Sequence, residues 1–186
     1  MWSTIRPKNS PENSRPCHEV SDSASRQIVV VADASPLIGL AKIARLDLLQ
    51  RLFGKVLIPE AVERELCLGS GRPGSQVLSA ARHEGWIKVE EVSGVPAALE
   101  ATVDQGEAEA ITLAKRHAAL LLIDETRGRA AARSAGLRVF GSGTVLIKAK
   151  QEGFLAAVAP ELGSLSAAGY HLSLSLQKEI LHQAGE

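Results

Sequence analysis

The stretch Val29-Val30-Val31-Ala32-Asp33-Ala34-Ser35-Pro36-Leu37-Ile38 decides the fold of this chain. It begins as a continuous run of apolar, mostly β-branched residues, which is typical of a strand buried on both faces of a sheet. Ser35 is a favourable helix N-cap and Pro36 a favourable first helical residue, so we expect a helix to follow the strand directly. Asp33 would then lie at the carboxyl end of a central strand, where open α/β sheets bind ligands. A role in supporting the turn alone fits this stretch equally well.

Strand and helix patterns alternate from this stretch to the end of the chain. Apolar runs predict further strands at residues 56–58, 86–89, 119–123 and 137–140. Helical spacing predicts helices at residues 46–53, 60–66, 75–84 (capped by Ser75), 104–114, 126–135 and 145–151, and then helices broken at Gly163, Gly169 and Gly185. Because connections are short and crossovers right-handed, this order predicts an α/β fold, a three-layer α/β/α sandwich with a central parallel sheet.

The composition bounds the class of protein. A chain of 186 residues that is 45% hydrophobic and 23% charged suits one globular domain. Basic and acidic residues number 21 each, which excludes a strongly basic nucleic-acid coat, and only 3% of residues are aromatic. The two cysteines form neither a disulfide framework nor a metal-binding pattern, and we find neither a membrane-spanning run nor a signal core. We therefore expect a cytoplasmic protein with no membrane association.

The first 27 residues differ from the rest of the chain. They are rich in Ser, Pro, Asn and charged residues, with almost no apolar periodicity. Such a segment cannot bury enough apolar surface to offset its ordering entropy. We expect a disordered N-terminal tail at residues 1–27 and a single domain at residues 28–186.

Carboxylates follow two of the predicted buried strands, as Asp33 and Asp124. Further acids lie in or near two predicted helix starts: Glu60, Glu63, Glu65, Glu107 and Glu109. If the sheet brings the strand ends together, these groups repel one another and require a cation. Without a His or Cys ligand set, an all-oxygen site suits Mg²⁺ or Mn²⁺ rather than zinc. Two such ions can promote phosphodiester cleavage. Alternatively, the helix-start acids are solvated charges that complement the helix dipole.

Four segments resemble, in the right order, the acidic motifs of PIN domains: residues 31–38, 57–66, 106–110 and 122–125. The sequences Gly-Glu-Ala-Glu-Ala at 106–110 and Ile-Asp-Glu at 123–125 resemble the PilT/VapC-like subgroup in particular. The resemblance implies a PIN-like fold and a Mg²⁺-dependent (or Mn²⁺-dependent) ribonuclease. Many relatives are toxins of toxin–antitoxin pairs, held inactive by an antitoxin.

The resemblance also implies roles for individual residues. The catalytic carboxylates would be Asp33, Glu65, Glu107 and Asp124, although classical members commonly have Asp where this chain has Glu107. The metal ligands would be Asp33, Glu107, Asp124 and Glu125, because the register around Asp124 is ambiguous by one residue. The expected RNA-binding residues are Ser35, Ser142, Arg127 and Arg129, with Arg72 as a further basic residue near the mouth of the site.

These sequence features suggest three functions. The first is a metal-dependent endoribonuclease, a toxin-like component whose partners are RNA and an antitoxin. The second is a non-catalytic PIN-like module that docks RNA or protein. The third, a haloacid-dehalogenase-like phosphatase, shares the strand–Asp–helix opening but requires a second Asp where this chain has Ser35.

The C-terminal third concentrates large aliphatic residues: Leu146, Ile147, Leu155, Leu162, Leu165, Leu172, Leu174, Leu176, Ile180 and Leu181. One face of a sheet needs only some of them, so we expect an exposed apolar patch and a homodimer. Alternatively, all of them are internal to the helical layer.

Overall fold

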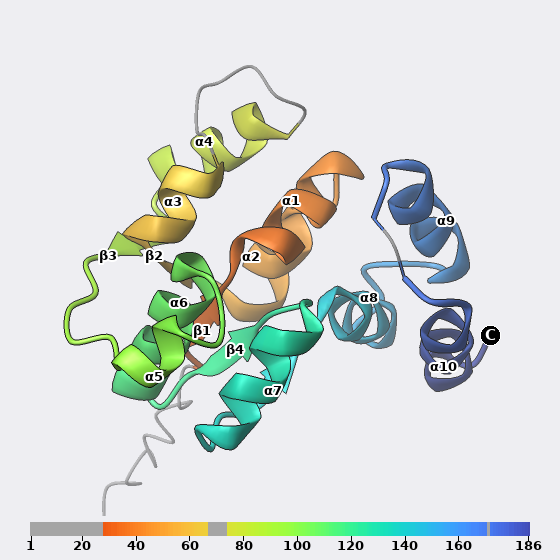
Figure 1. Ribbon diagram of the computed structural model, residues 1–186. Helices are drawn as coiled ribbons and strands as arrows, with labels where there is room; N and C mark the ends of the chain where they lie inside the picture. Colours follow the sequence, from red (N-terminus) through yellow and green to blue (C-terminus); the bar gives the residue numbers. More distant parts are fainter. Residues whose placement is uncertain (1–27, 67–73, 171) are drawn as a thin grey trace, which may run out of the picture.

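The computed structural model describes residues 28–66, 74–170 and 172–186 (Figure 1). Five parallel strands form one sheet in the order β3-β2-β1-β4-β5. The strands are β1 (Val30–Ala32), β2 (Val56–Pro59), β3 (Ile87–Glu90), β4 (Leu120–Leu122) and β5 (Val139–Phe140). β1 and β4 are neighbours, with Ala32 paired to Leu122. The segments that follow these two strands therefore leave the sheet side by side.

Helices connect the strands and follow the last one. They are α1 (Ala34–Lys42), α2 (Asp47–Phe53), α3 (Glu60–Leu66), α4 (Ser75–His83), α5 (Ala97–Glu100), α6 (Gln105–Arg116), α7 (Thr126–Ser134), α8 (Ser142–Gln151), α9 (Ala159–Ala167) and α10 (Leu174–Ala184). The predicted α/β sandwich with a central parallel sheet is confirmed. The predicted tail at residues 1–27, and Arg72 with its loop, lie outside the described residues.

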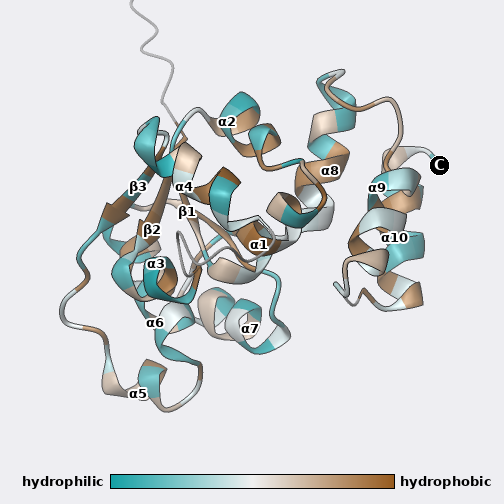
Figure 2. Ribbon diagram, turned by 90° about the horizontal axis from the view of Figure 1, so that it is seen from above, coloured by the Kyte–Doolittle hydropathy of each residue, from teal (hydrophilic) through white to brown (hydrophobic). Residues whose placement is uncertain are grey.

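Two apolar cores lie on opposite faces of the sheet (Figures 1 and 2). Successive side chains of a strand point to opposite faces. Val30 and Ala32 accordingly join the core under α1, α2 and α8, whereas Val31 joins the core under α6 and α7. Because both faces of β1 are covered, its end is held rigidly, and the residue that follows it has a fixed position.

Several predicted helix boundaries are wrong by a few residues. Helix α1 begins at Ala34 and its N-cap is Asp33, not Ser35. The N-cap of α4 is Gly74, in a left-handed conformation (φ 88°), rather than Ser75. Helix α8 begins at Ser142, and α9 continues through Gly163 without a break. Gly169 and Gly185 do follow helices, both with positive φ.

Most of the C-terminal aliphatic residues are internal, but not all of them, as the alternative interpretation required. Leu146, Leu162 and Leu165 belong to the core beneath α1 and α8. Helices α9 and α10 lie beyond α8, at the end of the molecule remote from β3 (Figures 1 and 2). The exposed members of the set are Leu174, at 77% exposure, and Leu176, at 45%. This is a small apolar surface, and the homodimer stays a prediction.

None of the helices in the described ranges is both long and apolar enough to cross a membrane.

Candidate functional site

Asp33 lies at the carboxyl end of β1 and is only 3% exposed. Its backbone N–H donates to the carbonyl oxygen of Leu122 (2.9 Å), and Oδ2 accepts from the N–H of Ser35 (3.4 Å), which caps α1. Burial raises the pKa of Asp33 to about 7, and the charges of Glu65 and Glu107 add to this shift. Asp33 therefore supports the turn and also lies near two other acidic residues; ligand binding at this position stays a prediction.

Glu107 reaches the same region from the first turn of α6. Asp104, the N-cap of α6, accepts from the N–H of Glu107 (2.8 Å) and fixes this turn. Glu107 is 4% exposed, and its Oε1 atom has no hydrogen-bond partner among the described residues. Burial and the charge of Asp104 raise its pKa. A buried acceptor without a partner is costly, so it indicates a position for a bound donor or cation.

Glycines allow α6 to approach its neighbours at this site. A Cβ atom at Gly128 of α7 would overlap with Oε1 of Glu107 and with Ile123. A Cβ atom at Gly106 would lie 3.2 Å from Oε2 of Glu65. These glycines therefore allow the side chains of Glu65 and Glu107 to pack closely against α6 and α7, respectively.

Glu65 lies in the last turn of α3 and keeps contact with solvent. Partial loss of hydration raises its pKa, and the charge of Asp104 adds to the shift. Asp33, Glu65 and Glu107, three of the four predicted catalytic carboxylates, thus influence one another electrostatically. We call these three residues the acidic cluster.

Asp124 has different surroundings. Its Oδ1 accepts from the backbone N–H of Ser142 (2.9 Å), and its Oδ2 accepts from the Ser142 hydroxyl (2.5 Å). The hydroxyl of Tyr170 also donates to Oδ2. The carboxylate that ends β4 is thereby tied to the start of α8 and to the segment between α9 and α10. Tyr170 is a residue that the sequence interpretation missed.

A cavity of about 400 Å³ opens beside the acidic cluster. Its lining includes Asp104, Glu107, Glu125 and Arg127. Glu125 is exposed there as the residue that precedes α7, and it adds negative charge near Glu107.

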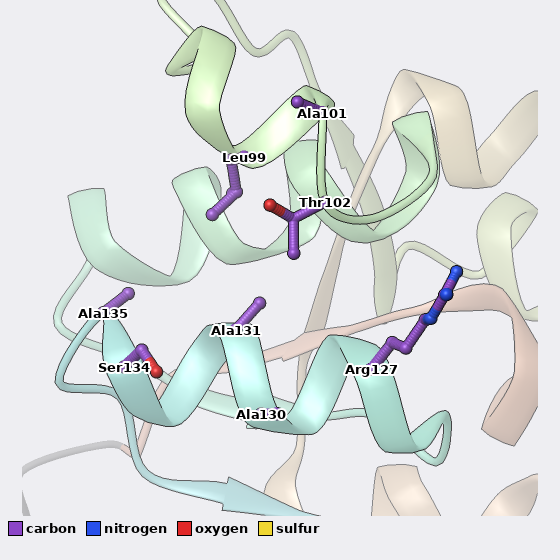
Figure 3. Close-up of a pocket in the computed structure, with 8 residues that line it drawn as sticks. All are labelled: Leu99, Ala101, Thr102, Arg127, Ala130, Ala131, Ser134 and Ala135. Atoms are coloured by element: carbon purple, nitrogen blue, oxygen red, sulfur yellow. The ribbon is translucent and has the colours of Figure 1, made fainter.

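A second cavity, of about 750 Å³, lies between α5 and α7 (Figure 3). Its lining is mainly small and apolar, with Leu99, Ala131 and Ala135 among its members, and Arg127 stands at one end. Ala101, Thr102 and Arg127 line both cavities. The two cavities therefore adjoin at these residues, and Glu107 lines the smaller one; we call the larger one, between α5 and α7, the groove.

The predicted RNA-binding residues separate into two kinds. Arg127 is exposed and lines the groove. Arg129 is half-buried and donates to the carbonyl oxygen of Ile123 (2.9 Å), and burial lowers its pKa. The hydroxyl of Ser142 donates to Asp124, and the N–H of Ser35 donates to Asp33. Of these four residues, Arg127 is the one with an exposed side chain.

The remaining helix-start acids contact neighbouring residues: Glu60 is an exposed charge, as the alternative interpretation held, Glu63 is half-buried, and Glu109 is buried rather than solvated. Glu63 forms an ion pair with Arg82 (2.7 Å). Glu60 lies 3.8 Å from Arg64 on the same helix. Glu109 accepts from the N–H of Ala61 (3.0 Å), which ties α6 to α3.

A complete metal cage is not formed by the residues that the structure describes: they contain no group of three or more His, Cys, Asp or Glu side chains that could hold a metal ion. Mg²⁺ usually keeps several waters and binds through one or two carboxylates. The acidic cluster, with an all-oxygen donor set and the unpartnered Oε1 of Glu107, fits this mode of binding.

Comparisons with known proteins give a matching family and similar solved structures. The family DUF3368, described as a PIN domain, matches residues 29–186. A PilT N-terminus domain protein from Sulfolobus solfataricus is 18% identical, with 65% of this chain and 92% of that chain covered and a TM-score of 0.46. The Pyrobaculum aerophilum protein PAE2754 is 19% identical, with 66% and 89% covered and a TM-score of 0.44. No curated protein matches the chain. With its parallel sheet and a family match over nearly all of the described residues, the chain belongs to the PIN domain family, whose members are typically nucleases and commonly bind Mg²⁺.

Proposed function

We propose that this chain is a metal-dependent endoribonuclease and acts as the toxin-like component of a toxin–antitoxin pair. The observation that carries the proposal is the buried Oε1 of Glu107, which has no hydrogen-bond partner in the described part of the chain, within a cluster that includes Asp33 and Glu65. Mutually repelling carboxylates at a strand end are stabilised by a cation. Membership in the PIN family, whose members are typically nucleases, supports a nucleic acid as the substrate.

Asp33 and Glu107 would hold a divalent ion, and Glu65 would add negative charge close to it. Asp124 and Glu125 border the same region from β4 and α7. When bound, the ion would activate a water and stabilise charge on the phosphate. The chain's own contribution is to fix these carboxylates on the rigid ends of β1 and α6.

The groove between α5 and α7 would hold RNA next to the acidic cluster. Arg127 lies where this groove meets the acid-lined cavity, so its guanidinium would bind a phosphate that flanks the cleaved bond. The small apolar side chains along α7 would leave room for a nucleoside (Figure 3).

Arg127→Ala should therefore weaken RNA binding and reduce its salt dependence. One lost phosphate contact lowers the slope of log affinity against log salt concentration by roughly 0.7 for a single strand. Arg133→Ala is the matched control, because Arg133 is another exposed arginine of α7 that does not line either cavity. Fluorescence anisotropy over a series of salt concentrations measures the RNA affinity and its salt dependence for both variants. If the two substitutions changed RNA affinity and its salt dependence equally, Arg127 would have no specific role in binding RNA.

The activity is tested by incubating the purified chain with a pool of RNAs in Mn²⁺, in Mg²⁺ and in EDTA. We expect internal cleavage with either metal and none in EDTA. Intact RNA under all three conditions would contradict the proposal.

A second candidate is the non-catalytic module. One observation favours it: Asp124 already accepts three hydrogen bonds, and the described residues form no three-ligand group. This candidate predicts RNA binding that is unchanged by EDTA and is not followed by cleavage.

A further inference from the structure

Tyr170 is the single tyrosine of the chain, and it connects the C-terminal helices to the strand ends. It lies between α9 and α10, 46 residues beyond Asp124, and its hydroxyl donates to Oδ2 of Asp124. Helix α9, which precedes Tyr170, is anchored to the end of α1 and to the residues just after it. Arg45 forms an ion pair with Glu161 (2.8 Å), and Lys42 donates to the carbonyl oxygen of Ala168 (3.4 Å).

The ring of Tyr170 is fixed against α1. A Cβ atom at Gly39 would lie 3.0 Å from Cε2 of the ring, so the glycine is what allows this approach. Burial raises the pKa of Tyr170, and the charge of Asp124 adds to the shift. The hydroxyl is consequently protonated at neutral pH and serves as a donor.

The hydrogen bonds at Asp124 leave one oxygen partly free. A carboxylate oxygen has about two lone-pair positions. Oδ2 uses both, for the hydroxyls of Ser142 and Tyr170, whereas Oδ1 uses one, for the N–H of Ser142. Rotation of the carboxylate would break these bonds, so, among the described residues, Oδ1 is the atom of Asp124 at which a further partner would bind.

We infer that Tyr170 is a positioning residue that orients Asp124 so that its Oδ1 atom is presented to a divalent cation. This inference rests on the proposed function, because it needs a cation at the strand ends. Partners that hydrogen-bond to metal ligands orient them, and their loss typically lowers metal affinity by about 10-fold to 100-fold. The C-terminal helices would then contribute to the site by delivering one hydroxyl.

The test is Mn²⁺ binding by isothermal titration calorimetry to the full chain and to Tyr170→Phe, which keeps the ring that packs on Gly39. We expect the affinity of Tyr170→Phe to fall by about tenfold. In an Asp124→Asn background the same substitution should have no effect. Ser164→Ala is the control: its hydroxyl donates to the carbonyl oxygen of Pro160 in α9, so removing it should leave affinity unchanged.

A second measurement keeps the hydroxyl of Tyr170 in place. Because the chain has one tyrosine, labelling with 3-fluorotyrosine gives a single ¹⁹F resonance. Mg²⁺ should shift this resonance in the wild-type chain and leave it unmoved in Asp124→Asn.

The outcomes separate this inference from the proposed function. A wild-type chain that binds no Mn²⁺ would overturn both. A wild-type chain that binds Mn²⁺, with equal or tighter binding by Tyr170→Phe, would overturn the role of Tyr170 alone. A ¹⁹F resonance that does not shift on addition of Mg²⁺, in a chain that binds the ion, would also overturn the role of Tyr170.

Discussion

The substitution Asp33→Asn is expected to abolish metal-dependent cleavage and to stabilise the metal-free protein at neutral pH. Asp33 is almost completely buried, and its pKa is raised to about 7 in the folded chain. In the unfolded chain the pKa returns to about 3.9. The folded state therefore binds more protons than the unfolded state between these values, and the free energy of unfolding falls as the pH rises through this window. The full loss is about 4 kcal/mol above pH 7.

The variant Asp33→Asn does not titrate, and Asn is as good an N-cap as Asp, so α1 should keep its start. Its gain in stability should be near zero at pH 4 and largest above pH 7. Urea unfolding in EDTA at a series of pH values measures this. Asp47→Asn is the control, since Asp47 is an exposed aspartate that forms a surface pair with Arg51. An Asp33→Asn protein that is less stable than wild type at pH 8, or that cleaves RNA at the wild-type rate, would contradict the assignment.

Glu107→Gln should remove most of the thermal stabilisation that a divalent cation gives. A ligand present at 100 times its dissociation constant stabilises the folded state by about 2.7 kcal/mol. In a domain of this size that corresponds to a rise in Tm of roughly 5–10 °C. Glutamine keeps the shape of the side chain but loses the charge that the cation requires.

The matched control for this experiment is Glu109→Gln, on the same helix and also buried. Glu109 binds the N–H of Ala61 and the amide of Gln105, so its substitution should lower Tm while leaving the rise caused by Mn²⁺ intact. Differential scanning calorimetry with and without Mn²⁺ measures all three proteins. If Mn²⁺ raised the Tm of Glu107→Gln as much as that of the wild type, the cation would bind at another site.

The sheet and the position of Asp33 could be predicted because local patterns determine them. The apolar run before Asp33 specifies a strand covered on both faces, and the equally apolar run before Asp124 specifies its neighbour. Helix starts were less predictable: Ser35 and Ser75 are good caps by type, but Asp33 and Gly74 precede the first helical turns. Which residue caps a helix depends on where the chain leaves the preceding element, and composition does not contain that information.

The different contacts of the acidic residues on α6 could not be predicted from their spacing in the sequence. Glu107 and Glu109 lie two positions apart on α6 and so face different neighbours. One has an unpartnered oxygen near Asp33, and the other binds the N–H of Ala61. Tyr170 carried no signal either, because a single tyrosine in an irregular segment belongs to no periodic pattern. Its contact with Asp124 depends on how α9 packs on α1 and α10 packs on α8.

The central claim is that the acidic cluster binds a divalent cation, and a crystal soaked in Mn²⁺ tests it most directly. An anomalous difference map locates the ion without reference to activity. We predict a peak in contact with the carboxylates of Asp33 and Glu107. A well-ordered crystal with no peak at these carboxylates, or with peaks only at surface acids such as Glu60 and Glu63, would contradict the account.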